Sequence, residues 1–165
     1  PFREGLAAAR RGNFAAAARI WETLAANGDP RAQYNLGYLH ANGQGVPKDY
    51  ARAIEWYTRA ASQGFAAAQF NLGVLLSSDD GVPPNYAAAL SWYRKAADQG
   101  DADARFNLGV AFASGQGVRV DFVEAFRWYS QAAAAGHRKA AATLESLMAE
   151  MTPEQLAEAR KPGAG

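Results

Sequence analysis

The stretch AQYNLGYLHANGQGV, residues 32–46, returns twice along the chain in slightly altered form. It reappears as AQFNLGVLLSSDDGV at residues 68–82 and as ARFNLGVAFASGQGV at residues 104–118, a shift of 36 residues each time. The segments that follow also match: DYARAIEWYTRAASQG, NYAAALSWYRKAADQG and DFVEAFRWYSQAAAAG. Because the three copies align without a gap, the chain contains three copies of one structural unit, which is typical of a repeat protein.

Each copy has the pattern of two helices joined by a loop. In the first copy we expect a first helix over residues 31–42, with a buried stripe at helical spacing formed by Ala32, Leu36, Gly37 and His40. Gly43 ends this helix, because the residue just past a helix end often needs a positive φ. The second helix starts after a residue that can cap free N–H groups, namely Asp49, Asn85 or Asp121. Its buried stripe in the first copy is Ala53, Trp56, Tyr57, Ala60 and Ala61.

The loop Gly43-Gln44-Gly45-Val46 has closely spaced glycines, as a phosphate-binding loop has. The common phosphate loops follow a β-strand, and nothing before Gly43 alternates like a strand. The second copy places Asp79 and Asp80 where a phosphate would lie, and the lysine of a P-loop is missing. We therefore interpret the glycines as turn residues between two helices. For the two aspartates, a cation site is an alternative to a solvated turn.

These motifs resemble the Sel1-like repeat, a relative of the tetratricopeptide repeat (TPR). The resemblance is carried in the first copy by Ala32, Leu36, Gly37, Gly43, Gly45, Val46, Asp49, Ala53, Trp56, Tyr57, Ala60, Ala61 and Gly64. The pattern departs at Asp79, which replaces the first loop glycine, and at Arg119, which replaces the proline of the other copies. The resemblance implies an all-α fold: a right-handed α-solenoid of helix-turn-helix Sel1-like and TPR-like repeats.

We expect residues 1–165 to form a single repeat domain. Its predicted parts are a TPR-like unit at 1–29, Sel1-like repeats at 30–65, 66–101 and 102–137, a final first-type helix at 138–151, and a short capping helix with a tail at 152–165. The capping helix begins with Thr152, Pro153 and Gln155, in the pattern of a capping box. Because the chain begins at Pro1 without methionine, we expect a fragment or a processed form.

Small and aromatic residues are expected to hold the helices together. Glu145 stands where the other first helices have glycine, so we infer that those glycines let the two helices of a repeat approach closely. Stacking of successive hairpins should bury the repeated Trp and Tyr rings, and truncating a buried aromatic side chain costs about 3–5 kcal/mol. We therefore expect Trp92→Ala to lower the melting temperature sharply.

The composition argues against several classes of function. Lys and Arg number 17 against 16 Asp and Glu, without the concentrated basic face that nucleic-acid binders usually show. No apolar run approaches the roughly 18 residues needed to cross a bilayer, so we expect no direct membrane insertion. Without cysteine, the chain has no disulfide, thiolate metal site or cysteine nucleophile.

Residue sets for catalysis or metal binding are missing as well. His40 and His137 have no partner at metal-ligand spacing, and we interpret His40, which stands on the core stripe, as a packed or half-exposed residue. The common serine-hydrolase and zinc-protease motifs do not occur. We therefore expect no catalytic residue, no cofactor and no metal. The alternative is a β-lactam-binding or β-lactam-hydrolysing enzyme, because cysteine-rich Sel1-like proteins have been discussed in that role, although this chain has no cysteine and no acylating serine motif.

The resemblance implies that the first helix of each repeat lines a concave groove. Two ladders follow the repeat spacing on this face, the aromatic Tyr34, Phe70 and Phe106 and the amides Asn35, Asn71 and Asn107. Residues that do not repeat are better candidates for specificity, namely Arg31, Tyr38, Asn42, Ser78 and Asp103. The face continues in the last first-type helix at Lys139, Ala142, Thr143, Ser146 and Glu150. Both ladders have an alternative role in packing, the rings against the preceding unit and the amides against helix ends or neighbouring carbonyls.

The resemblance therefore predicts a non-enzymatic scaffold or adaptor that binds another protein or a peptide segment in its groove. Bacterial members of the family often serve in envelope signalling, cell-pole organisation or host contact, sometimes beside peptidoglycan-binding domains. The resemblance thus favours a bacterial source and a periplasmic or other extracytoplasmic location. It does not identify the partner.

Overall fold

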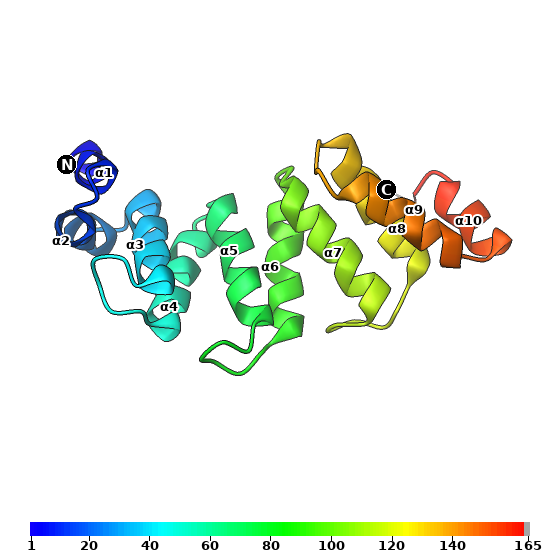
Figure 1. Ribbon diagram of the computed structural model, residues 1–165, viewed down its shortest axis with the longest axis horizontal. Coiled ribbons are helices and arrows are strands. Elements are labelled where there is room, and N and C mark those ends of the chain that lie inside the picture. The colour runs from blue at the N-terminus through cyan, green and yellow to red at the C-terminus, as the bar shows by residue number, and fades with distance from the viewer. Residues whose placement is uncertain (164–165) are drawn as a thin grey trace. The chain divides into compact units, whose positions relative to one another are not determined.

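The structure is a computed structural model that describes residues 1–163, and these residues contain ten α-helices and no β-strand (Figure 1). The predicted tail ends at residues 164–165, which lie outside the described part. The helices are α1 (Phe2–Arg10), α2 (Phe14–Ala26), α3 (Pro30–Asn42), α4 (Tyr50–Ser62), α5 (Ala66–Ser77), α6 (Tyr86–Asp98), α7 (Ala102–Ser114), α8 (Phe122–Ala134), α9 (Ala140–Glu150) and α10 (Pro153–Arg160).

The chain divides into two compact units by its internal contacts. Unit 1 runs from Pro1 to Asn85 and holds α1 to α5, and unit 2 begins at Tyr86 and holds α6 to α10. Within each unit every helix packs on the next one along the chain, except that α10 packs on α8. The predicted all-α fold of helix-turn-helix repeats is confirmed. The right-handed sense of the solenoid and the grouping of residues 1–165 as one domain stay predictions.

The predicted helix ends are confirmed where the structure gives their geometry. Gly43 follows α3 with a φ of 64°, in the left-handed region. The side chains of Asp49 and Asp121 each accept the backbone N–H of the third helical residue, at 3.0 Å. At α10, Thr152 and Gln155 form the predicted capping box. Local sequence therefore sets where these helices begin and end.

The aromatic core is built from tyrosine more than from tryptophan, which corrects the role expected for Trp92. The tyrosines of the second helices are almost fully buried, with 2%, 5% and 3% of their surface exposed for Tyr57, Tyr93 and Tyr129. The adjacent tryptophans are only half-buried: Trp56, Trp92 and Trp128. Two of them carry a cation over the ring, Arg59 over Trp56 and Lys95 over Trp92.

The helix glycines make room for these tyrosines. A Cβ atom on Gly37 would lie 2.6 Å from Cδ1 of Tyr57, and one on Gly109 would lie 2.5 Å from Cδ1 of Tyr129. Such distances are far inside van der Waals contact. The inferred close approach of the two helices is therefore confirmed at these positions, with the tyrosine ring as the contacting group.

The second loop glycine of each repeat also serves close packing. A Cβ atom on Gly45 would overlap the backbone at Phe14, the first residue of α2. The same atom on Gly117 would lie 2.8 Å from Cβ of Tyr86, the first residue of α6. These loops therefore lie over the start of the preceding second helix, as turns that also cover an aromatic residue.

Candidate functional site

In unit 1, residues of the predicted partner-binding face contact one another through hydrogen bonds and packed aromatic rings. Asn71 of α5 donates its side-chain N–H groups to the hydroxyls of Tyr34 (3.3 Å) and Tyr57 (3.4 Å). The Tyr34 ring lies 5.7 Å from the Tyr57 ring and 5.3 Å from that of Phe65. Burial raises the pKa of Tyr57, and the hydrogen bond from Asn71 lowers it in part. Tyr34 and Asn71 thus have a packing role in this unit.

Three of the other candidates in unit 1 also bond within the chain. Arg31 forms an ion pair with Asp29 at 2.8 Å, and this bond lowers the pKa of the Asp29 carboxyl. Asn42 donates its side-chain amide to the carbonyl of Tyr38, and the Ser78 hydroxyl accepts the N–H of Asp80. Besides Tyr38, two candidates are left, Asn35 and Phe70, and both are half-buried.

Tyr38 differs from the others because its side chain is exposed. It is 46% exposed, and Val74, at the same position of the next repeat, is 39% exposed. Tyr38 lies one turn beyond Tyr34 on α3, and Val74 lies one turn beyond Asn71 on α5. Since Tyr34 and Asn71 are in contact, Tyr38 and Val74 extend the same side of unit 1 as an exposed apolar pair.

In unit 2, the candidate residues near the start of α7 contact the segment that precedes α9. The rings of Phe106 and His137 are stacked, with centroids 4.1 Å apart, and Phe106 also packs on Tyr129. Nδ1 of His137 accepts the N–H of Lys139, so the ring proton is on Nε2, which donates to Asp103 at 3.2 Å. Asp103 and Phe106 are thus structural contacts here. The last candidate, Asn107, is half-buried.

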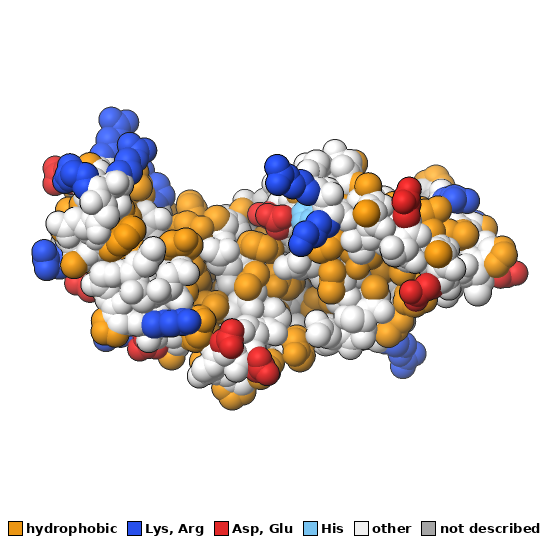
Figure 2. Space-filling model, in the orientation of Figure 1, with side chains coloured by type: hydrophobic (Ala, Val, Ile, Leu, Met, Phe, Trp, Pro, Cys, Tyr) orange, Lys and Arg blue, Asp and Glu red, His pale blue; other side chains and the backbone are white. Residues whose placement is uncertain are grey.

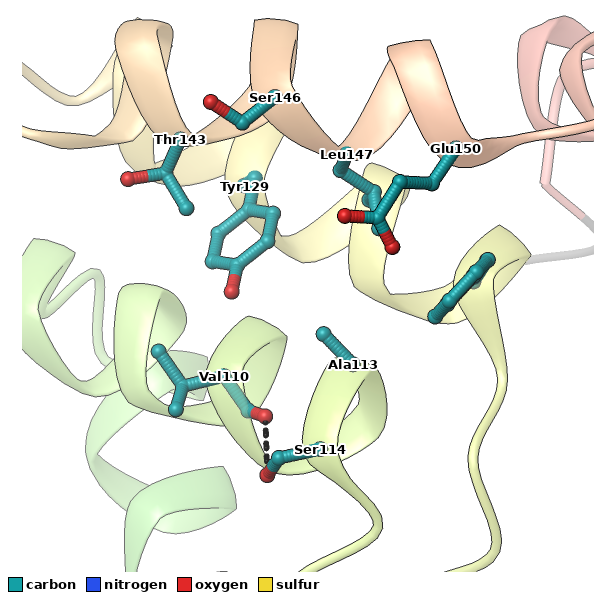
Figure 3. Close-up of a pocket in the computed structure, with 9 residues that line it drawn as sticks. Val110, Ala113, Ser114, Tyr129, Thr143, Ser146, Leu147 and Glu150 are labelled. Carbon is teal, nitrogen blue, oxygen red and sulfur yellow. Dashed lines mark hydrogen bonds between the residues drawn. The ribbon is translucent and has the colours of Figure 1, made fainter.

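Further along the same helices, α7 and α9 enclose an open cleft of about 330 Å³ with α8 at its base (Figure 3). We call it the α7–α9 cleft. Figure 2 shows that hydrophobic side chains gather over these helices, with acidic side chains beside them. The cleft is lined by Val110, Ala113 and Ser114 of α7, Phe122 and Tyr129 of α8, and Thr143, Ser146, Leu147 and Glu150 of α9.

The α7–α9 cleft occurs where two contacts of the other repeats are missing. Thr143 takes the position of Asn71, so the amide that bonds the buried tyrosine hydroxyl in unit 1 is replaced by a shorter side chain. Phe122, the first residue of α8, takes the position of Phe14 and Tyr86. A glycine loop lies against the backbone and Cβ atoms of those two residues, whereas α9 is followed directly by α10. The cleft therefore results from the end of the repeat pattern.

The hydroxyl groups that line the cleft donate to their own helices. Ser114 donates to the carbonyl of Val110, Thr143 to Lys139 and Ser146 to Ala142, at 2.7, 2.8 and 3.2 Å. Their remaining lone pairs can only accept. The Tyr129 hydroxyl points into the cleft (Figure 3), and burial raises its pKa, so the phenol is neutral at physiological pH.

No lysine or histidine lines the cleft beside the serine and threonine hydroxyls. No group of three or more potential metal ligands occurs within residues 1–163. Asp79 and Asp80 are exposed in their loop, and His40 is buried in α3, 6% exposed, as the sequence predicted.

Part of the lining of the α7–α9 cleft was predicted from the sequence. Thr143, Ser146 and Glu150 were expected on the partner-binding face, and the structure brings them together. Phe122 and Tyr129 were not predicted there, because helical spacing assigns Tyr129 to the core and nothing in the repeat pattern singles out Phe122. The signal available in the sequence was the lack of a glycine loop after α9.

The repeats of this chain are similar to those of known proteins. The Sel1 repeat pattern matches residues 30–65, 66–101 and 102–137, which together make up more than half of the chain. This chain belongs to the Sel1 repeat family. No curated protein matches it. Among the helices of residues 1–163, none has the length and apolar character needed to cross a bilayer.

Solved structures of Sel1 repeat proteins are similar over most of this chain. A Sel1 repeat protein from Oxalobacter formigenes is 37% identical, with a TM-score of 0.80 over 87% of this chain and 59% of its own. A protective antigen of uropathogenic Escherichia coli strains with an SLR fold is 34% identical, with a TM-score of 0.77 over 88% of this chain and 33% of its own. This chain thus spans only part of either relative's length.

These similarities support the fold and the general class of function. They show the all-α solenoid class and fit a bacterial source. Sel1 repeat proteins are generally protein-interaction scaffolds, and their fold is typically non-enzymatic. Sel1 repeats accordingly suggest protein partners.

Proposed function

We propose that this chain is a non-enzymatic scaffold that binds a segment of another protein along the first helices of its repeats. These are α3 and α5 in unit 1 and α7 and α9 in unit 2. The observation that carries the proposal is the exposed pair Tyr38 and Val74 in unit 1. Aromatic residues are frequent anchors of protein interfaces, and an apolar pair at one repeat position offers contact area that packing does not use.

The proposed contact uses Tyr38, one of the non-repeating residues that the sequence favours for specificity, and not the two ladders. The ladder residues Tyr34 and Asn71 bond to each other within the unit, so they support the surface instead of supplying its free groups. Tyr38 and Val74 supply the contact in unit 1, and the α7–α9 cleft supplies it in unit 2. The interaction needs neither a cofactor nor a metal, and it involves no nucleic acid.

A capture experiment with two matched variants tests the proposal. The wild-type protein, the double variant Tyr38→Ser with Val74→Ser, and the control Ala51→Ser with Arg52→Ser on α4 are immobilised and exposed to a lysate of the source cells. Both pairs are exposed, so circular dichroism should show the same fold for all three proteins. A partner retained by the wild type and the control should be lost from the Tyr38 and Val74 variant. Equal retention by all three would contradict the proposed surface.

We place this interaction in bacterial envelope signalling or cell organisation, outside the cytoplasm and with peptidoglycan nearby. The description of the E. coli relative as a protective antigen supports an accessible location. Fractionation of the source bacterium with an antibody against this chain tests the location, because recovery in the cytosolic fraction alone would contradict it.

A further inference from the structure

The α7–α9 cleft has an apolar wall, and most of its polar groups are hydrogen-bond acceptors. Its wall is formed by Val110, Ala113, Phe122 and Leu147. In Figure 3, the side chains of Ala113 and Leu147 point into the space, from α7 and α9 respectively. A flexible aliphatic chain fits such a space, since it removes apolar surface from water on both sides.

Most polar groups of the cleft are acceptors. The three hydroxyls of Ser114, Thr143 and Ser146 use their protons on their own helices, as described above. The hydroxyl of Tyr129 is directed into the same space. No lysine, arginine or histidine is among the lining residues. A ligand that enters this cleft therefore finds acceptors and few donors, which favours a ligand rich in N–H groups.

One end of the cleft is negatively charged. Ser114 and Glu150 are the last residues of α7 and α9, so both helices end at the cleft, and neither has a basic residue in its last turn. Helix C-termini carry partial negative charge. The Glu150 carboxylate points down from α9 toward the cleft (Figure 3), and within residues 1–163 it forms no ion pair. This end is complementary to a cation.

From this geometry we infer that the α7–α9 cleft binds one basic side chain, lysine or arginine, of the partner segment. The methylene stem lies against Val110 and Leu147, and the cationic head reaches Glu150. The inference deepens the proposed function and rests on it for the identity of the ligand as part of a protein. Unit 1 lacks an equivalent, because Ser78 takes the position of Glu150 and Asn71 that of Thr143.

Titration of the whole labelled chain with short peptides tests the inference by NMR. The probes are acetylated Ala-Ala-X-Ala-Ala peptides, with X as arginine, lysine, citrulline or norleucine. The arginine or lysine peptide should shift the signals of Val110, Thr143 and Leu147. The neutral peptides should bind about tenfold more weakly, because they leave the carboxylate unpaired. The arginine and lysine arms show which head group the cleft prefers.

Three variants test which residues contribute to binding of the basic peptides. Glu150→Gln should weaken binding of the basic peptides about tenfold and remove its dependence on salt, because the screened charge pair is lost. Glu145→Gln makes the same chemical change at an exposed position of α9 outside the cleft, and it should bind as the wild type does. Thr143→Asn should also weaken binding, since the amide would occupy the space beside the Tyr129 hydroxyl as Asn71 does at Tyr57.

The inference is overturned if norleucine and arginine peptides bind equally, if Glu150→Gln leaves affinity unchanged, or if the shifted signals lie away from the cleft. Its failure is distinct from failure of the proposed function. The peptide titration concerns unit 2 alone, whereas the capture experiment tests the exposed pair of unit 1. Loss of peptide binding with intact partner capture would remove only the cleft from the interface.

Discussion

Gly37 and Tyr57 form the contact that most directly links residue type to packing in unit 1. The ring takes the space that a side chain on Gly37 would need, and it is 2% exposed. In the predicted TPR-like unit the same arrangement uses Gly5 and Trp21, whose indole would meet a Cβ atom on Gly5. One aromatic ring over one helix glycine is thus a shared device, although the ring differs.

The substitution Gly37→Ala should lower stability. In an exposed helix, glycine to alanine normally stabilises by about 1 kcal/mol. Here the added methyl group would lie 2.6 Å from the Tyr57 ring, and such overpacking costs about 1–3 kcal/mol. Thermal unfolding followed by circular dichroism measures the sign.

The matched control for this prediction is Glu145→Ala, at the equivalent position of α9. Glu145 is exposed, so its truncation should leave the melting temperature nearly unchanged. A higher melting temperature for Gly37→Ala would show that Tyr57 gives way easily, and that the glycine is not required by this contact.

At the level of helices, α10 shows how the last repeat is completed. Its Ala159 is 5% exposed and packs in the cluster that contains Tyr129 and Met151. The guanidinium of Arg127 on α8 donates to the carbonyl of Glu158 at 3.2 Å. The expected capping helix therefore covers α8 with a buried face of its own, while the region above Phe122 stays open as part of the cleft.

Thr152→Ala should loosen α10. The Thr152 hydroxyl accepts the N–H of Gln155, and the Gln155 side chain accepts the N–H of Thr152. Loss of an N-cap side chain costs about 1 kcal/mol. Hydrogen exchange of the amides in α10 should accelerate, while exchange in α3 and α4 stays as in the wild type. Unchanged exchange in α10 would show that packing on α8 alone holds the helix.

At the level of the whole chain, stability should depend on pH at the alkaline end. Burial raises the pKa of Tyr34 and Tyr57 in unit 1 and of Tyr129 in unit 2. The unfolded chain releases phenol protons near the ordinary pKa of about 10, whereas the folded chain retains them. The contribution of these protonated phenols to the free energy of unfolding is therefore fully present below about pH 10. It falls as the pH rises above that value.

Urea unfolding near neutral pH and above about pH 10 measures this loss. In Tyr57→Phe the fall in unfolding free energy should be smaller than in the wild type, because one titrating phenol is absent. An identical fall in both proteins would assign the alkaline loss to other groups.

The sequence alone was sufficient to predict the repeat, the helices and their caps. Spacing identified Ala32 and Leu36 as core, and both are completely buried. Spacing did not distinguish Trp56 from Tyr57, because both lie on the buried side of one helix and only the facing Gly37 determines which ring fits. The outcome for the candidate site was similar: sequence placed Thr143 and Glu150 on the binding face, and the open space between them was not predicted.

Periodicity, capping residues and glycine positions determine helices because they act over a few neighbouring residues, and repetition every 36 residues carries that local information through the chain. Distant contacts determine the rest: the Asn71 amide meets Tyr34 from a position 37 residues away, and α10 turns back onto α8. The α7–α9 cleft depends on two such contacts that the last repeat does not make. A space between helices is a property of packing, and no local pattern of residues encodes it.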